Sequence, residues 1–398
     1  VEKNYLLVRY SGQFSVENLN DTKQLEKNED IFVQVHEFET GEITCAYEPY
    51  LTMICDGFRR YMTGTFEEFM ETCDVYYLHR PVLLGYFNQD NTGREEIILL
   101  DEVAYEQERM LAALERMLCA IADRHPVLFV LNRFQLASKS TMQLTARFLK
   151  CENCNIGLVL GVSDIQAMPE FLVPDWEMLY ETLDDGSKIY HIGNSGRKKE
   201  ETIDDEKYVD YGSEKVYRKL QNMVEFLDFD QAAYYLETIE RKIKFDNLLV
   251  DDAARFRMWL LFVKVSILRQ DIPKALEICE DLEKIHLAGK EEECAYEQDY
   301  LIATAYMYQG KLKEALEMAG ETYRIAGKKS DDYRMCLSEL LEAKIQMSGW
   351  YNIFFCAQDV KIKESLIQNL IRYNYRNHLA HVYIYAYDNK PEIVKKAN

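Results

Sequence analysis

Two polar pairs follow apolar runs in the first half of the chain, and they differ in the chemistry they could support. Asp101 and Glu102 follow the apolar run 97–100. Paired carboxylates at the end of a strand bind a divalent cation and polarise a water molecule. Asn132 and Arg133 follow the longer apolar run 127–131. This second pair offers no carboxylate, so it cannot support the same chemistry.

Cysteine and histidine side chains give weaker indications of a metal or redox site. Cys151 and Cys154 form a CxxC pair at the end of an expected helix, but a zinc site needs four ligands and no second CxxC or CxxH lies in this half. Two buried or half-buried thiols are the favoured interpretation, and a redox role is the alternative. His378 and His381 share one helical face and are interpreted as core or surface residues. We therefore predict no metal site. No Ser–His–Asp or Cys–His pattern is evident locally.

Composition limits the classes of protein to which the chain can belong. Its 398 residues favour two or three domains, and an apolar content of 48% is that of a globular protein. Only 17 glycines and 7 prolines indicate a largely helical chain. A net charge of −21 argues against nucleic-acid binding. No apolar window approaches the ~20 residues that span a bilayer.

Ten cysteines without a compact framework predict reduced thiols, and hence a cytoplasmic protein. No signal peptide is recognisable at the start of the sequence. The chain begins with Val1 and ends at Asn398, just after the expected start of a further helix. Both ends could be cuts from a longer protein, in which case an output domain would lie outside the sequence.

Strands and helices alternate over residues 1–194, which predicts an α/β domain with a parallel sheet. The charged stretch 195–211 is the expected linker. Residues 212–398 are expected to form helical repeats. The elements expected in the first half are strands at 5–9, 31–35, 97–100, 127–131 and 156–162, and helices at 18–28, 47–61, 66–73 and 105–123.

A recurring spacing of small residues supports the repeats. Ala303, Gly310 and Ala315 are spaced as in a tetratricopeptide repeat, in which small residues let two helices approach and the glycine opens the turn. Ala275 precedes Ala315 by 40 residues, and Ala232 precedes Ala275 by 43. A fourth copy has Gly349 in its turn and Tyr351 after it, and a fifth helix pair is expected near residue 362. A plain helical bundle is the alternative.

Residues 5–19 and 105–164 together resemble the STAND-class, AAA-type P-loop ATPases, which are bacterial signal-transducing regulators with tetratricopeptide repeats after the ATPase module. The long helix 106–125, the strand 127–131 and the following turn resemble the helix, catalytic strand and turn of that module. The run 159–163 resembles the next strand. On this resemblance Asn132 and Arg133 occupy the positions of the two acidic residues that hold magnesium.

The loop after the first strand is a degenerate version of the phosphate-binding motif of that class. A working loop reads G-x-x-x-x-G-K-[ST]. On the resemblance, Gly12 is the first glycine, and Ser15 lies within the loop. Glu17, Asn18 and Leu19 then replace the second glycine, the lysine and the metal-binding hydroxyl. The alternative is an ordinary strand–turn–helix without a nucleotide history.

The resemblance implies a regulatory protein, or a fragment of one, with an inactive ATPase module and helical repeats that bind a protein, a peptide or a small-molecule signal. We expect no cofactor. Any enzymatic activity would be the magnesium-dependent hydrolysis of ATP. Self-association and a part in transcriptional regulation are further implications. Two alternatives remain: a divergent ATPase that uses Asp101 and Glu102, with Asn132 as a sensor residue, and a pure interaction scaffold.

If the repeat register is correct, the first helix of each pair lines a partner-binding groove. The residues that the register places in the groove are Tyr217, Gln221, Arg257, Lys264, Glu297, Tyr300 and Thr304.

Overall fold

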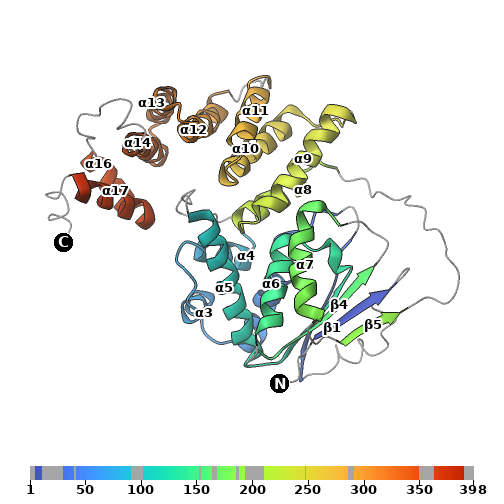
Figure 1. Cartoon of the computed structure of the whole chain (residues 1–398). Coiled ribbons are helices and arrows are strands. Elements are labelled where there is room, and N and C mark those ends of the chain that lie inside the picture. Colours follow the sequence, from blue (N-terminus) through green and yellow to red (C-terminus); the bar gives the residue numbers. More distant parts are fainter. Residues whose placement is uncertain are drawn as a thin grey trace. The chain divides into compact units, whose positions relative to one another are not determined.

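The computed structural model divides the chain into two compact units, which are described separately. The first comprises Val1–Arg94 with Ala104–Tyr235, and the second comprises Glu95–Val103 with Leu236–Asn398. The helices and strands are drawn in Figure 1. The residues described are 5–10, 30–39, 42–90, 102–151, 154–163, 168–184, 188–192, 210–246, 248–285, 291–348 and 363–389.

A parallel five-stranded sheet is the centre of the first unit. Its strand order is β2-β3-β4-β1-β5, and every neighbouring pair is parallel. Five of the six residues of β3 are buried, which explains its uninterrupted apolar sequence, because a covered parallel sheet has no solvent face. The predicted parallel sheet of an α/β domain is therefore confirmed. The strands are β1 (Tyr5–Tyr10), β2 (Phe32–Glu37), β3 (Val127–Asn132), β4 (Ile156–Ser163) and β5 (Lys188–Ile192).

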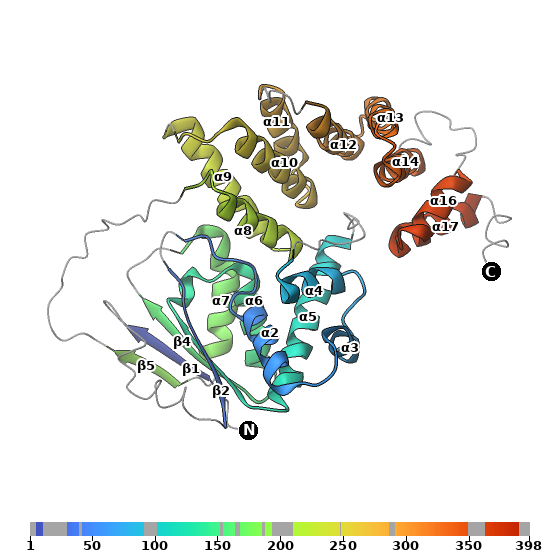
Figure 2. The same ribbon diagram turned by 180° about the vertical axis from the view of Figure 1, so that it is seen from behind.

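Helices flank the sheet in both views (Figures 1 and 2). In α5 (Val103–Ala122) the fully buried residues Met110, Leu114 and Ile121 recur at helical spacing, so that one stripe faces the core. A Cβ added at Gly57 would lie only 2.8 Å from Ile121 Cγ2, which shows how closely α2 approaches α5. The other helices of this unit are α2 (Tyr50–Tyr61), α3 (Phe66–Thr72), α4 (Arg80–Asn88), α6 (Lys139–Lys150), α7 (Val173–Asp184), α8 (Glu214–Glu225) and the start of α9, with 3₁₀ turns η3 (Phe134–Leu136) and η4 (Glu170–Leu172).

The unit boundary differs from the expected one. We expected the first domain to end at residue 194 and the helical domain to start at residue 212. The structure instead places α8 and the start of α9 in the first unit, and the division falls at Tyr235, inside α9. The physical reason is that side chains of residues 219–235 form hydrogen bonds and ion pairs with the α/β part of the unit. The expected linker lies almost wholly outside the described residues, as does the expected strand 97–100.

The second unit is helical, and paired helices follow one another along the chain. The alanines that the repeat register marked as close contacts, Ala275, Ala303 and Ala315, are fully buried. The fifth pair expected near residue 362 is present as α16 and α17, whereas Gly349 and Tyr351 lie outside the described residues. The helices are α9 (Phe229–Phe245), α10 (Asp252–Leu268), α11 (Ile272–Leu282), α12 (Glu291–Gln309), α13 (Leu312–Lys328), α14 (Asp332–Met347), α16 (Glu364–Arg372) and α17 (Arg376–Asn389).

Five turns between consecutive helices have the same backbone geometry. In each turn one residue has a positive φ, and the next N–H donates to the carbonyl five residues before it, as Lys311 does to Tyr306 at 2.9 Å. This is the Schellman arrangement that ends a helix. Gly310, with φ 82°, takes the predicted role of turn residue. The corresponding positions elsewhere are occupied by Leu227, Gln270, Ser330 and Asn374.

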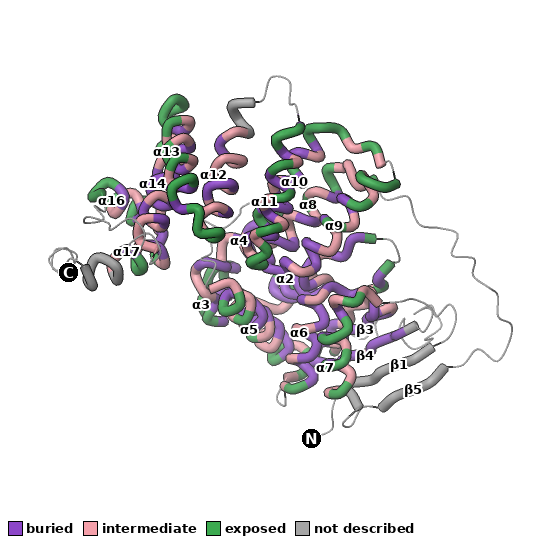
Figure 3. The backbone as a smooth tube through the Cα atoms, turned by 45° about the horizontal axis from the view of Figure 1, so that its top comes forward, coloured by how far each residue is buried: buried purple, intermediate pink, exposed green. Residues whose placement is uncertain are grey.

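Burial follows the helix faces, with buried and exposed residues along different sides of the same helix (Figure 3). The second unit contains two apolar clusters. One is formed by α12, α13 and α14, and the other is formed by α14, α16 and α17. Tyr300 packs against both clusters. Within the described residues, no helix has the length and apolar character needed to cross a membrane.

Candidate functional site

The sheet order defines where a ligand crevice would open. The strand that follows β1 in the chain, β2, lies at one edge of the sheet, and the strand that follows β4, β5, lies at the opposite edge. Ligands of open parallel sheets bind beyond the carboxyl ends of the strands, at the point where the connections diverge. Here that point lies between β1 and β4, whose last residues Tyr10 and Ser163 are paired in register.

The loop that the sequence predicts to bind phosphate lies outside the described residues. Gly12, Ser15, Glu17, Asn18 and Leu19 all follow β1 and belong to that group. Asp101, from the alternative ATPase interpretation, also lies outside the described residues. Glu102 is described, and its carboxylate oxygen Oε1 lies 3.8 Å from Nε2 of His381.

The end of β3 is described, and it has the polar pair that the sequence places there. Asn132 is 1% exposed and is the last residue of the strand. Its Oδ1 accepts a hydrogen bond of 3.0 Å from the N–H of Arg133. Nε of Arg133 lies 3.4 Å from Oε1 of Glu37, the last residue of the neighbouring β2. The strand ends β2 and β3 are thus joined by an ion pair.

A second polar cluster lies at the N-terminus of α6, immediately after β3 and η3. The helix begins after Ser138, whose hydroxyl accepts from the N–H of Thr141. Buried hydroxyl groups continue from there, since the Thr145 hydroxyl bonds that of Tyr50 at 2.6 Å. Backbone N–H groups at a helix N-terminus attract anionic and carbonyl oxygens because they have no partner within the helix.

Side chains from the start of α9 occupy these α6 donors. Oδ2 of Asp228 accepts from the N–H of Ser140 at 3.0 Å, and Oε1 of Gln231 accepts from the N–H of Lys139 at 3.2 Å. The ammonium group of Lys139 is also paired with Asp230. Asp228 is 4% exposed, and this burial raises the pKa of its carboxyl group above the ordinary value. No local sequence pattern indicates this cluster, because Asp228 and Ser140 are 88 residues apart.

Further contacts attach the same helix pair to the loop after β2. Nζ of Lys219 lies 2.8 Å from Oε1 of Glu42 and 2.7 Å from the carbonyl oxygen of Ile43. The N–H of Thr44 donates to the hydroxyl of Tyr235 at 3.4 Å. We call the set formed by Lys219, Asp228, Asp230, Gln231 and Tyr235 the hairpin clasp.

A hollow of about 470 Å³ lies between α2, α4 and α8. Its wall includes the guanidinium-bearing residues Arg59 and Arg218, the carboxylates of Asp56 and Glu225, and the ring of Tyr86. The volume is in the range of small-molecule sites. Gln221, one of the predicted groove residues, also lies in the wall.

The other predicted groove residues are distributed over both units. Tyr217 is half-buried on α8, and Arg257 and Lys264 are exposed on one face of α10, seven residues apart. Three residues of α12 have contacts within the second unit. Glu297 is paired with Arg334, Tyr300 packs in the core, and the Thr304 hydroxyl donates to the carbonyl of Tyr300 at 2.8 Å. The side chains of these three residues are therefore engaged in contacts between or along helices.

A buried charged cluster lies at the junction of α4 and α5. His79 and Glu106 have no exposed surface, and Nε2 of His79 lies 3.0 Å from Oε2 of Glu106. Nη1 of Arg109 donates to the other carboxylate oxygen at 2.6 Å, and its guanidinium lies over the ring of Tyr76. Because these contacts join the start of α4 to α5, the cluster is interpreted as a structural link between the two helices.

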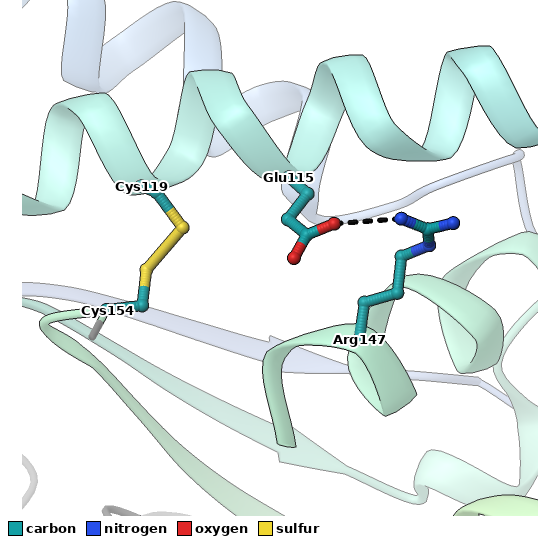
Figure 4. The surroundings of a disulfide bond; sticks show 4 residues. All are labelled: Glu115, Cys119, Arg147 and Cys154. Atoms are coloured by element: carbon teal, nitrogen blue, oxygen red, sulfur yellow. Dashed lines mark hydrogen bonds and ion pairs between the residues drawn. A yellow bond between two sulfur atoms is a disulfide. The ribbon is translucent and has the colours of Figure 1, made fainter. Parts of the chain in front are cut away.

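The CxxC pair has a third cysteine beside it. Cys154 forms a disulfide with Cys119 of α5, which is 35 residues earlier (Figure 4). The prediction that all thiols are reduced is therefore wrong for these two residues. The histidines agree with the sequence interpretation, since His378 is buried with Nε2 at 2.9 Å from Nζ of Lys344, and His381 is exposed.

The comparisons with known proteins give no relatives. No family model, no curated protein and no solved structure matches this chain.

Proposed function

We propose that the chain is a regulatory protein that binds a partner through its helical hairpins and uses a non-hydrolysing α/β module of the STAND class as their platform. The observation that carries the proposal is the end of β3. Asn132 and Arg133 stand there in place of carboxylates, and the nearest carboxylate across the sheet, Glu37, is paired with Arg133. Magnesium is bound in such sites through one or two carboxylates.

The order of the strands supports the assignment of the module. It puts the carboxyl end of β1 at the switch point, and nucleotide phosphates bind at such a position in α/β proteins of this kind. It also leaves β3 one strand away, so that its end would face the same crevice. The tetratricopeptide character of the second unit is supported by the buried alanines and the repeated turn.

The hairpin clasp supports the role of platform. It fixes the first helical hairpin to the α/β part through buried side-chain bonds rather than through a bound ligand. A protein of this design changes state when a partner competes with the clasp, and nucleotide has no part in it. The exposed Arg257 and Lys264 are the residues through which we expect an acidic partner segment to bind.

The proposal is tested by nucleotide binding and by hydrogen exchange on the full chain. We expect no heat of binding with ATP or ADP and magnesium up to millimolar concentration, and no change in exchange at α6 or α8. The double change Asp228→Ala and Gln231→Ala should raise exchange at both helices. Asp251→Ala removes a similar cap in the second unit, where Oδ1 accepts from Ala254 at 2.9 Å, and should leave α6 unchanged.

Micromolar nucleotide binding would contradict the proposal, and it would direct attention to Asp101 and Glu102. Protection of α6 by nucleotide alone would contradict it as well, because it would show that the nucleotide, and not a partner, controls the clasp.

A further inference from the structure

Three cysteines from separate segments meet at one end of the first unit. Cys119 lies near the end of α5, Cys151 caps the C-terminus of α6, and Cys154 lies just before β4. Their sulfur atoms all lie within 4.8 Å of one another, and all three residues are partly exposed. Figure 4 shows the Cys119–Cys154 bridge beside the ion pair of Glu115 and Arg147, where α5 and α6 run next to each other.

We propose that the reduced forms of Cys119, Cys151 and Cys154 bind one thiophilic metal ion, with zinc as the reference ion, and that the disulfide closes this site. Three cysteine thiolates with a water molecule in the fourth position are a coordination that zinc adopts in some proteins. Soft thiolate donors select zinc and monovalent copper over harder ions.

The geometry fits a metal ion without movement of the backbone. Two thiolates on one tetrahedral zinc ion, each at about 2.3 Å from the metal, have their sulfurs about 3.8 Å apart. The observed limit of 4.8 Å exceeds that separation by an amount that side-chain rotation covers. The disulfide shows that two of the sulfurs reach each other, and the third lies within the same limit of both.

Partial exposure separates this cluster from most of the other described thiols. Cys55, Cys279 and Cys336 are buried, and burial raises the pKa of the Cys55 and Cys279 thiols to about 12. A metal ion needs deprotonated, accessible sulfur. Among the described residues, these three are the only group of three or more cysteine, histidine or acidic residues with metal-ligand spacing.

Oxidation and metal binding use the same atoms, so they exclude each other. Opening the disulfide takes two electrons and two protons from a reductant such as a dithiol, which becomes a disulfide itself. Binding of zinc to the three thiols then releases their protons to solvent. The oxidised chain retains only the Cys151 thiol of the three, and a single thiol does not form the site.

The test is a titration of the full chain with cobalt and zinc. The chain is reduced with a phosphine, the reductant is removed, and cobalt is added while the thiolate-to-cobalt absorption is recorded. We expect one cobalt ion per chain, displaced by one equivalent of zinc. Cys119→Ser, Cys151→Ser and Cys154→Ser should each weaken binding by more than about a hundredfold, since loss of an outer-shell partner alone costs up to that.

Cys45→Ser is the matched control, because Cys45 is also partly exposed and lies outside the cluster. It should bind metal like the wild type, and the oxidised wild type should bind none. If a cysteine variant does not fold, alkylation of the wild type replaces it. Zinc should then protect the three cysteines from iodoacetamide, and the reduced chain without zinc should be alkylated at all three.

Three results would overturn the inference. These are a reduced chain without absorption bands, a Cys151→Ser variant that binds like the wild type, and equal binding by the oxidised and reduced chains.

Discussion

At the scale of single residues, Asp228 combines burial, hydrogen bonding and a raised pKa in one carboxyl group. Its carboxylate is buried and accepts from the N–H groups of Ser140 and Gln231. Two hydrogen bonds to a buried anion stabilise the clasp, while removal of the charge from water opposes it. The raised pKa shows that the loss of hydration is the larger effect.

Asp228→Asn should change how stability depends on pH. Because the folded-state pKa is raised, the contribution of Asp228 is present below the ordinary carboxyl pKa of about 3.9 and is lost as pH rises through the folded value. The free energy of unfolding of the wild type should therefore fall relative to that of Asp228→Asn as the pH rises above about 4. Urea unfolding of both proteins at several pH values measures the difference.

The control for this prediction is Gln231→Ala, which removes the neighbouring cap without removing a titratable group. It should cost about 1 kcal/mol at every pH, because one buried hydrogen bond is lost. A difference between wild type and Asp228→Asn that does not vary with pH would contradict the assigned role of burial.

At the scale of elements, a comparison of Gly310 with Gly320 distinguishes the effect of backbone conformation on stability from the effect of packing. A Cβ added at Gly310 or at Gly320 would meet no atom within 4 Å. Gly310 has φ 82°, whereas Gly320 lies within α13. Gly310→Ala should destabilise the second unit by about 1 kcal/mol, and Gly320→Ala should stabilise it by a similar amount.

Denaturant unfolding of the two glycine variants and the wild type is the measurement. Because neither substitution creates a contact, opposite signs can come only from the backbone conformation. Two changes of the same sign would show that the turn at Gly310 is not held in the left-handed region.

The elements that could be predicted from sequence are those with a local pattern. The ends of β3 and β4 lie within one residue of the predicted ends, because each is a continuous apolar run between polar residues. The turn at Gly310 was recognisable because glycine favours positive φ. The turn at Ser330 was missed, because a serine gives no such signal.

The site was predicted only in its local part. Asn132 and Arg133 at the end of β3 follow from reading one strand. The clasp and the third cysteine require pairs of residues that are 88 and 35 positions apart. Neither Asp228 nor Cys119 lies in a motif, so no local spacing identifies its partner.

At the scale of the whole molecule, the chain should unfold in two steps. Its contacts fall into two units, each with its own core, and compact units of this size fold independently. Differential scanning calorimetry should show two transitions. Gly57→Ala should lower only the first unit's transition, since the added methyl group meets Ile121 at 2.8 Å and overpacking costs about 1–3 kcal/mol.

Gly310→Ala is the counterpart in the second unit and should lower only the other transition. One transition that moves with both substitutions would contradict independence, and it would show that α9, which contributes residues to both units, couples them fully.

The repeated turns have a consequence for how the stability of the chain could be raised. In four of the five turns between consecutive helices, the positive-φ residue has a Cβ; these residues are Leu227, Gln270, Ser330 and Asn374. A side chain in the left-handed region costs roughly 1 kcal/mol relative to glycine. Replacing exposed turn residues such as Gln270 and Ser330 by glycine would remove this cost without disturbing a buried contact. The turns, rather than the helices, are therefore where substitutions could increase the stability of the chain.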